Sequence, residues 1–318
     1  MKLRFGYVSH ALALYEATPA RTMTFARYSK LSKEEREDKL LSVTDTNLTN
    51  TLRALHYNIA HEIKLYRMSS SIVPLATHPE VKWDYQTPFR EKFKEIGDLV
   101  KKHNLRVSFH PNQFTLFTSP RQQVTENAVI DLEYHTSMLE LMGLDNSAIT
   151  NIHIGGAYGD KEATLERFHQ NFETVPERIK SRITLENDDK TYNAEETLDV
   201  CEETGVPFIF DYHHHMANQG NGLPDRFFER VENTWKNRGV SVKYHLSSPK
   251  SESAYRSHAD YVDPEFALPF LEMLKEHGED ADIMIEAKKK DLAALKLVED
   301  LSSIRGVKRL DGSTLLWK

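Results

Sequence analysis

The sequence contains a single cysteine, Cys201, among its 318 residues. A disulfide within the chain is therefore excluded, and a zinc site built on cysteine thiolates is not expected. No apolar stretch approaches the roughly 18 residues that a membrane-spanning helix needs. The first residues, MKLRFGYVSH, lack the long apolar segment of a signal peptide. We therefore expect a cytoplasmic protein without a membrane segment.

The chain also lacks an excess of positive charge. Its 41 Lys and Arg are outnumbered by 48 Asp and Glu, which gives a formal net charge of −7. This balance argues weakly against a protein that binds nucleic acid through its overall charge. It is a weak argument because carboxylates gathered to hold metal ions make a site acidic only until the ions bind. No glycine-rich phosphate-binding pattern follows the first predicted strand, which disfavours a nucleotide-binding open sheet.

Short apolar segments typical of buried strands alternate along the chain with amphipathic helical segments. Eight strands in this alternation predict the α/β class and a closed (β/α)8 TIM barrel, which forms a single domain over residues 1–318. A doubly wound open sheet is the alternative fold. The predicted strands cover residues 3–9, 63–69, 105–110, 149–154, 182–186, 207–211, 241–246 and 282–286.

The connection after the first strand is longer than the others and covers about residues 10–44. Its charged run KEEREDK, residues 33–39, is typical of the solvated face of a helix. Elsewhere, Asn193 followed by Glu196 predicts a capping box at the start of a helix, and Gly205 predicts the end of that helix.

In a barrel of this type the active site lies at the carboxyl ends of the strands. The third to the eighth strands all end in a residue that can bind a metal ion. These residues are His110, His153, Glu186, Asp211, His245 and Glu286. One such residue is unremarkable, since 15 His and 48 Asp or Glu occur in the chain. Six in succession exceed chance placement, and buried groups of this kind need a cation. The sequence therefore predicts a metal centre.

Three consecutive histidines follow Asp211, and they cannot all point at one site. A strand end followed by a turn brings residues i and i+3 together, so we expect His214 to join Asp211. His213 and His215 are then expected behind the ligands or at the surface. His258 lies in the loop after the seventh strand, and spacing alone leaves its role open.

Lys243 shares a strand face with His245, because residues i and i+2 of a strand point the same way. A buried lysine beside metal ions would be neutral, be chemically modified, or contact an anionic phosphate. The donor set around it contains imidazole and carboxylate but no sulfur, which suits Mn²⁺, Zn²⁺, Fe²⁺ or Co²⁺. The donors are too many for one ion, so we expect two or three ions that share carboxylates.

Seven motifs in combination resemble those of the UV damage endonucleases, over about residues 3–290. They are GYVS at Tyr7, HPNQF at His110, NIHIGG at His153, LENDD at Glu186, DYHHH at Asp211, KYHLSS at Lys243 and IEAK at Glu286. None of the motifs is specific alone. The family is similar in fold and metal arrangement to endonuclease IV, and more distantly to the xylose isomerase-like barrels.

The resemblance implies a DNA repair endonuclease that nicks immediately 5′ to cyclobutane pyrimidine dimers and 6-4 photoproducts, leaving a 3′-hydroxyl and a 5′-phosphate. Some members also cut at abasic sites. The implied partner is damaged double-stranded DNA, and the implied cofactor is two or three divalent ions, Mn²⁺ with Zn²⁺, Co²⁺ or Mg²⁺ as alternatives. We expect a monomer without an obligatory protein partner. By matching motif positions, the metal ligands fall on His110, His153, Glu186, Asp211, His214, His245, His258 and Glu286.

The resemblance also implies roles for residues beyond the ligands. Lys243, which can be carboxylated in the family, is implied to act in catalysis together with Glu186 and His78. The residues implied to contact the lesion are Tyr7, Gln113 and Phe114. Phe114 stands where a tyrosine can stand in relatives, so a hydroxyl is lost but a stacking surface is kept.

The loop that carries Gln113 suits insertion between the bases of a flipped-out lesion. Its apolar residues Phe114, Leu116 and Phe117 could instead pack on the top of the barrel, and we expect this for at least one of them. Basic residues that could hold the DNA backbone lie in the same set of loops. They are Arg21, Arg27, Arg121, Lys250, Arg256 and Lys288.

Two other functions share this barrel and its ligands. One is a metal-dependent sugar isomerase or epimerase of the xylose isomerase-like group, which would have a closed polar pocket for one sugar. The other is a metal-binding barrel without catalysis. An insertable HPNQF loop with a basic rim favours the DNA enzyme over both.

Overall fold

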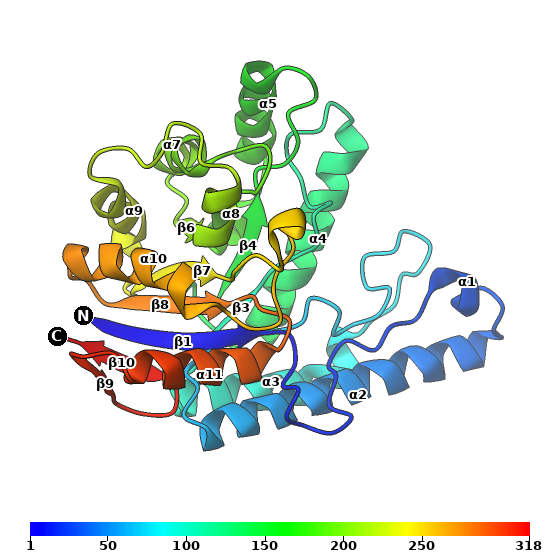
Figure 1. Cartoon of the computed structure of the whole chain (residues 1–318). Helices are drawn as coiled ribbons and strands as arrows, with labels where there is room; N and C mark the ends of the chain where they lie inside the picture. The colour runs from blue at the N-terminus through cyan, green and yellow to red at the C-terminus, as the bar shows by residue number, and fades with distance from the viewer.

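The computed structural model describes residues 1–318 and contains a closed barrel of eight parallel strands (Figure 1). The barrel closes because β1 pairs in parallel with both β8 and β2. The predicted (β/α)8 fold is therefore confirmed, and the open sheet is excluded. The barrel strands are β1 (Lys2–Val8), β2 (Leu65–Arg67), β3 (Arg106–Phe109), β4 (Ile149–His153), β5 (Ile183–Glu186), β6 (Phe208–Asp211), β7 (Val242–Leu246) and β8 (Ala281–Ile285).

Helices follow the strands and surround the barrel (Figure 1). They are α1 (Phe25–Tyr28), α2 (Lys33–Ala60), α3 (Gln86–Lys102), α4 (Gln122–Leu141), α5 (Lys161–Glu173), α6 (Glu177–Lys180), α7 (Ala194–Thr204), α8 (Tyr212–Ala217), α9 (Phe227–Trp235), α10 (Pro264–His277) and α11 (Lys290–Ser302), with 3-10 turns η1 (Lys236–Arg238) and η2 (Glu252–Ala254). The predicted capping box between Asn193 and Glu196 starts α7, and Gly205 ends it with a φ of 70°. No helix combines the length and the apolar character needed to cross a bilayer.

The extension after β1 is shorter than predicted. Ser32 and Glu35 form a capping box, so α2 begins at Lys33 and the extension ends at residue 32. The charged run 33–39 is the exposed first part of this helix, as expected. Figure 1 shows α1 at the far end of α2, where both project to one side of the barrel.

A hairpin near the C-terminus was not predicted. It consists of β9 (Val307–Arg309) and β10 (Thr314–Trp317), and β10 pairs antiparallel with residues Lys2 to Arg4 of β1. The two termini consequently lie side by side (Figure 1). The turn dipeptide Asp311-Gly312 is the one sequence signal that could have indicated it.

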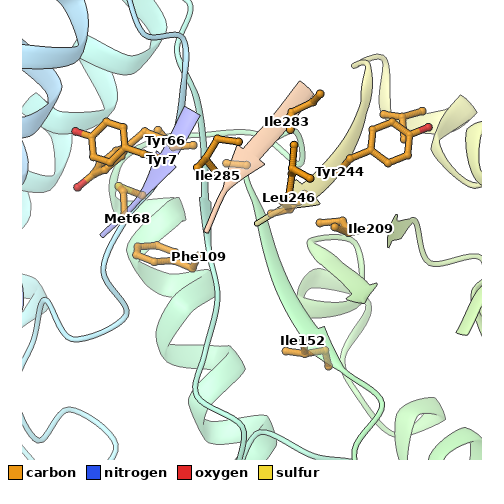
Figure 2. Close-up of a cluster of buried hydrophobic side chains, with 14 of the residues drawn as sticks. Tyr7, Tyr66, Met68, Phe109, Ile152, Ile209, Tyr244, Leu246, Ile283 and Ile285 are labelled. Atoms are coloured by element: carbon orange, nitrogen blue, oxygen red, sulfur yellow. The ribbon is translucent and has the colours of Figure 1, made fainter. Parts of the chain in front are cut away.

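The two faces of the barrel strands differ in character. Side chains that point outward are large and apolar and pack under the helices, in a core cluster of 71 buried residues. Figure 2 shows part of this layer, with Tyr7 beside Tyr66 and with Ile283 and Ile285 from β8. The inward face is largely polar, because the same alternation that places Tyr7 outside places Arg4 inside.

The inward side chains at the amino end of the barrel form an ion cluster. Arg4 Nε lies 2.5 Å from Asp282 Oδ1, and Arg106 Nη1 lies 2.7 Å from Asp282 Oδ2. The Arg106 guanidinium also lies over the Trp235 ring, 5.1 Å from its centroid. We call Arg4, Arg106 and Asp282 the basal ion cluster. Asp282 is fully buried there, and its charge is balanced by protein cations.

Candidate metal centre

Seven of the eight predicted ligands converge at the carboxyl end of the barrel. Their donor atoms form three groups, and the atoms of each group lie within 4.8 Å of one another. Glu186 belongs to all three groups. The groups are His110, His153 and Glu186; Glu186, Asp211 and His214; and Glu186, His245 and Glu286. We call these seven residues the strand-end cluster.

Glu186 at the end of β5 is the centre of this cluster. Its Oε2 lies 3.3 Å from His110 Nε2 and 3.1 Å from His245 Nδ1, and its Oε1 lies 3.3 Å from His214 Nδ1. Asn151 of β4 donates a hydrogen bond to Oε2 and fixes the carboxylate. One fully buried carboxylate therefore faces three imidazoles from three different strand ends.

Three histidines are oriented in the same way by the backbone. The Nδ1 atoms of His153, His214 and His258 lie 3.3, 3.0 and 2.8 Å from the carbonyl oxygens of Glu186, Asn187 and Glu286. A carbonyl oxygen only accepts, so the proton of each neutral ring is on Nδ1, and Nε2 keeps its lone pair. Metal-binding histidines are oriented by this type of contact. His258 lies outside the three groups, but its ring centroid is 6.1 Å from that of His214.

Buried oxygens without donors support the metal assignment. Glu186 Oε1 and Asp211 Oδ2 are buried and accept no hydrogen bond from the protein. A buried carboxylate oxygen without a partner is costly, and a cation removes that cost. The other oxygen of Asp211 accepts from the backbone N–H of His214 at 2.7 Å, which caps α8 and holds the predicted pair together. The residues present therefore fit divalent ions.

The cluster perturbs the pKa values of its own members. Burial favours the neutral imidazole, but the carboxylates of Glu186 and Glu286 raise the pKa of His245 to about 9. Burial likewise opposes the charge on His214, yet Asp211 and Glu186 hold its pKa well above the usual value. Burial lowers the pKa of His110 to about 4, because its contact with Glu186 is too weak to offset the loss of water.

Lys243 is fully buried on the inward face of β7, below His245. Its Nζ has no hydrogen-bond partner, and it pairs in register with Asp282 of the basal ion cluster. Burial, followed by the positive charge of Arg106, holds the pKa of Lys243 well below its usual value. Loss of water therefore disfavours the charged form of this side chain.

Two residues implied by the resemblance lie outside the cluster. Tyr7 points outward, is fully buried, and donates from its hydroxyl to Asn58 of α2 at 2.8 Å. The structure places Tyr7 under α2 and not at the barrel mouth, so its expected lesion contact stays a prediction. His78, in the loop after β2, stacks on Phe25 of α1 with ring centroids 4.1 Å apart and joins none of the three ligand groups.

The other two histidines after Asp211 lie behind the ligands, as expected. His213 is buried, and its ring nitrogens contact Ser247 Oγ at 2.8 Å and the Tyr255 carbonyl at 2.6 Å. His215 is buried against Phe210.

The loop after β3 divides its apolar residues between two roles. Phe114 is 71% exposed, while Phe117 is fully buried against Phe168 and Phe172 of α5. The Asn112 side chain accepts from the Phe114 backbone N–H at 2.9 Å and fixes the turn at the tip. The expectation that at least one of these residues packs on the barrel is therefore confirmed for Phe117.

The predicted basic residues are all exposed and lie in the segments that follow barrel strands. Arg256, in the loop after β7, is 56% exposed at its side chain, and its nearest carboxylate is 3.8 Å away in Asp189. The others are Arg21, Arg27, Arg121, Lys250 and Lys288.

Sequence reasoning missed three polar residues of the site. Asn151 holds Glu186, and the Asn187 side chain brackets Asp211 by contacting both backbone groups of Asp211, at 3.0 and 2.9 Å. Arg67 ends β2 and forms an ion pair with Glu286. The available signal was position: Arg67 ends its strand where the next six strands carry ligands.

Comparison with known proteins agrees with this geometry. The family model described as UV-endonuclease UvdE matches residues 3–318. A UV DNA damage endonuclease of Bacillus pumilus (strain SAFR-032) is 61% identical over 100% of both chains. The crystal structure of SacUVDE superimposes with a TM-score of 0.83 at 30% identity, over 95% of this chain and 100% of that chain.

A more distant match concerns the fold alone. Endonuclease IV from Thermus thermophilus gives a TM-score of 0.52 at 14% identity, over 89% of this chain and 91% of that chain. The resemblance drawn from the seven motifs is confirmed by the family match, which overrules the sugar isomerase and the non-catalytic barrel. This chain is an enzyme of the UV-endonuclease UvdE family.

Proposed function

We propose that this enzyme nicks DNA immediately 5′ to cyclobutane pyrimidine dimers and 6-4 photoproducts, and also at abasic sites, leaving a 3′-hydroxyl and a 5′-phosphate. The observation that carries the proposal is Glu186, a single buried carboxylate shared by three ligand groups. Phosphate-ester cleavage by clustered divalent ions needs such shared carboxylates. We expect the enzyme to act as a monomer on damaged duplex DNA.

The residues that would hold the ions are the strand-end cluster and His258, whose Nε2 is left free by the Glu286 carbonyl. Two or three ions are consistent with the three ligand groups that share Glu186. Mn²⁺ suits their imidazole and carboxylate donors, and Zn²⁺, Co²⁺ or Mg²⁺ are alternatives. Bound ions would supply charge stabilisation for phosphoryl oxygens and activation of water.

The chain's own residues would position the substrate. Gln113 and Phe114 at the tip of the β3 loop would fill the space of the flipped lesion, and Arg256 would contact the backbone. Lys243 would serve as a neutral amine or, after it adds CO₂ and loses a proton, as a carbamate anion directed at the ions. A catalytic role of His78 and a lesion contact of Tyr7 would require movement, because His78 stacks on Phe25 and the Tyr7 hydroxyl donates to Asn58.

The proposal is tested with an end-labelled duplex, UV-irradiated or not, incubated with the protein and Mn²⁺ with or without EDTA. We expect one nick at the phosphodiester on the 5′ side of the photoproduct, no nick in the unirradiated duplex, and no nick with EDTA. The length of the labelled product reports the position of the cut. Equal cutting of both duplexes, or cutting that survives EDTA, would overturn the proposal.

A further inference from the structure

The side of the barrel mouth formed by β8, β1 and β2 differs from the rest, because it carries cations. Arg67 ends β2 on the inward face, next to Val8 of β1 in register, and its carbonyl accepts from the Ser9 N–H at 2.8 Å. These backbone contacts fix Arg67 at the same level as the strand-end cluster. Glu286 directly follows β8, which lies on the other side of β1, and it forms the ion pair with Arg67.

The Arg67 guanidinium is only partly used by the protein. Its Nη1 donates to Glu286 Oε1, and neither its Nε nor its Nη2 donates to any protein atom. The side chain is 16% exposed, so these N–H groups face the mouth and not the packed core. A guanidinium presents its five donors as a planar fork that matches two oxygens of a phosphate. Half of this fork is anchored, and half is open to a ligand.

A second cation, Lys290, follows Glu286 by four residues. Lys290, the first residue of α11, is half-buried, has a φ of 50°, and forms no ion pair. Burial lowers the pKa of Lys290, and the positive charge of Arg67 adds to this effect. Glu286 pairs with Arg67 and also faces His245 Nδ1 at 3.0 Å. Glu286 thus has two cationic partners already, while the Lys290 ammonium has no ion-pair partner and is available to an anion.

We propose that Arg67 and Lys290 form a phosphate-binding site on this side of the centre, in which Arg67 is a catalytic residue that contacts the scissile phosphodiester. The proposal rests on the proposed function for the identity of the phosphodiester. Arg67 donates from Nε and Nη2 to the non-bridging oxygens while Glu286 holds Nη1. Lys290 adds a point charge to the same phosphate or the next one along the strand.

The test uses full-length Arg67→Gln, Arg67→Lys and Lys290→Gln, with Arg178→Gln as a matched control. Arg178 is also an ion-paired arginine, but it pairs with Glu133 and Glu140 on the helical surface. We expect Arg67→Gln to lower kcat for nicking of UV-irradiated duplex by about 100-fold or more, the scale for one lost transition-state donor. Arg67→Lys should recover part of this loss. Lys290→Gln should lower kcat/KM by only about 3- to 10-fold and make the salt dependence of binding shallower by about one charge.

A second readout does not depend on the damaged substrate. Inorganic phosphate is titrated calorimetrically into each Mn²⁺-loaded variant, and metal content and thermal unfolding are measured in parallel. Arg67→Gln should weaken phosphate binding at least about tenfold with unchanged metal content, while Arg178→Gln behaves as wild type. Loss of metal with unchanged phosphate affinity would show that Arg67 only positions Glu286 and would overturn the proposal, as would unchanged kcat in Arg67→Gln. If wild type fails to nick irradiated DNA yet phosphate binding falls in Arg67→Gln, the proposed function is wrong and the phosphate site stands.

Discussion

The two ends of the barrel interior solve the problem of buried charge in opposite ways. At the amino end, Asp282 is balanced by Arg4 and Arg106 at 2.5 and 2.7 Å. At the carboxyl end, Glu186 Oε1 and Asp211 Oδ2 are buried and accept no hydrogen bond from the protein. At the amino end both oxygens of Asp282 are paired, and the unpaired atoms are Nε and Nη2 of Arg106, which cannot bind a cation. At the carboxyl end the unpaired atoms include carboxylate oxygens, which can. A buried ionic cluster therefore indicates a metal site only when its own residues leave it unbalanced.

The same strands supply both ends. On β3, Arg106 and His110 are four residues apart on one face, and on β8 so are Asp282 and Glu286. That spacing corresponds to roughly 13 Å along a strand. Lys243 of β7 is in register with Asp282, and its charge is affected by Arg106, Asp282 and Arg4 of the basal ion cluster and by Arg67 of the other end. Depth in the barrel, and not residue type, decides whether a charge is structural or functional.

The largest loss of nicking activity is expected from a substitution in the strand-end cluster. Glu186→Gln keeps the shape of the side chain but removes the charge shared by all three ligand groups. Nicking of irradiated duplex should fall on the order of a thousandfold, and metal content per chain should drop. His258→Ala, which removes one peripheral ligand, should cost only about 10- to 100-fold. Elemental analysis and single-turnover nicking measure both, with the exposed Glu177→Gln as control. Equal losses in the Glu186 and His258 variants would contradict the central position of Glu186.

A substitution in the basal ion cluster should lower the free energy of unfolding and leave the metal content unchanged. Asp282→Ala leaves Arg4 and the buried Arg106 without their carboxylate, at a cost of about 3–5 kcal/mol in the free energy of unfolding. Urea unfolding gives this value. A drop in metal content at a concentration of denaturant where the variant is still folded would show that the two ends are not independent.

The charge of the strand-end cluster depends on pH through His245. The folded-state pKa of His245 is raised to about 9, so its charged form stabilises the metal-free protein fully below about 6.5, the pKa in the unfolded chain, and this contribution is lost as the pH rises through about 9. A metal ion requires the neutral imidazole, so metal affinity should rise by about tenfold per pH unit for each displaced proton between pH 6 and 9. Mn²⁺ titrations in buffers of different ionisation enthalpy measure proton release directly. No proton release at pH 7 would refute this linkage.

The smallest effect on the centre is expected from the loop above it. Gln113→Ala combined with Phe114→Ala should weaken binding to damaged duplex by about tenfold to several hundredfold, since base stacking contributes roughly 1–3 kcal/mol per contact. Metal content should stay unchanged, and a lesion that is already unpaired should be cut with a smaller defect. Ile130→Ala, which removes another exposed apolar side chain, serves as control. A double variant that loses metal or unfolds would show that the loop is structural.

The sequence predicted the barrel and the convergence of seven candidate ligands, because both follow from strand ends, where one residue per strand faces the mouth. Asp211 and His214 were correctly paired by their i, i+3 spacing, which α8 realises with the Asp211 cap. The outward direction of Tyr7 was not predicted, because its motif does not state which face of β1 it occupies, although Phe5 and Tyr7 are both buried and lie on the same face. Arg67 was missed because arginine is not a metal ligand type.

Other features depend on contacts that no local pattern contains. His78 lies in a loop whose course is set by stacking on Phe25 from a distant segment. The partners of Glu186 and Asp211, Asn151 and Asn187, are ordinary asparagines until the strands pair. The C-terminal hairpin is defined by its pairing with β1, which lies at the opposite end of the chain.

The pairing of β10 with β1 also affects the order in which the barrel strands can pair during folding. Residue Lys2 is matched with Leu316, and β1 needs β8 as its other neighbour, so the first strand made is the last to be enclosed. Such high contact order slows folding, because the entropy of closing the longest loop is lost before these contacts form. A nascent chain on the ribosome would carry an unpaired, apolar β1 until residues 281–317 had emerged, and we expect this early species to depend on chaperones.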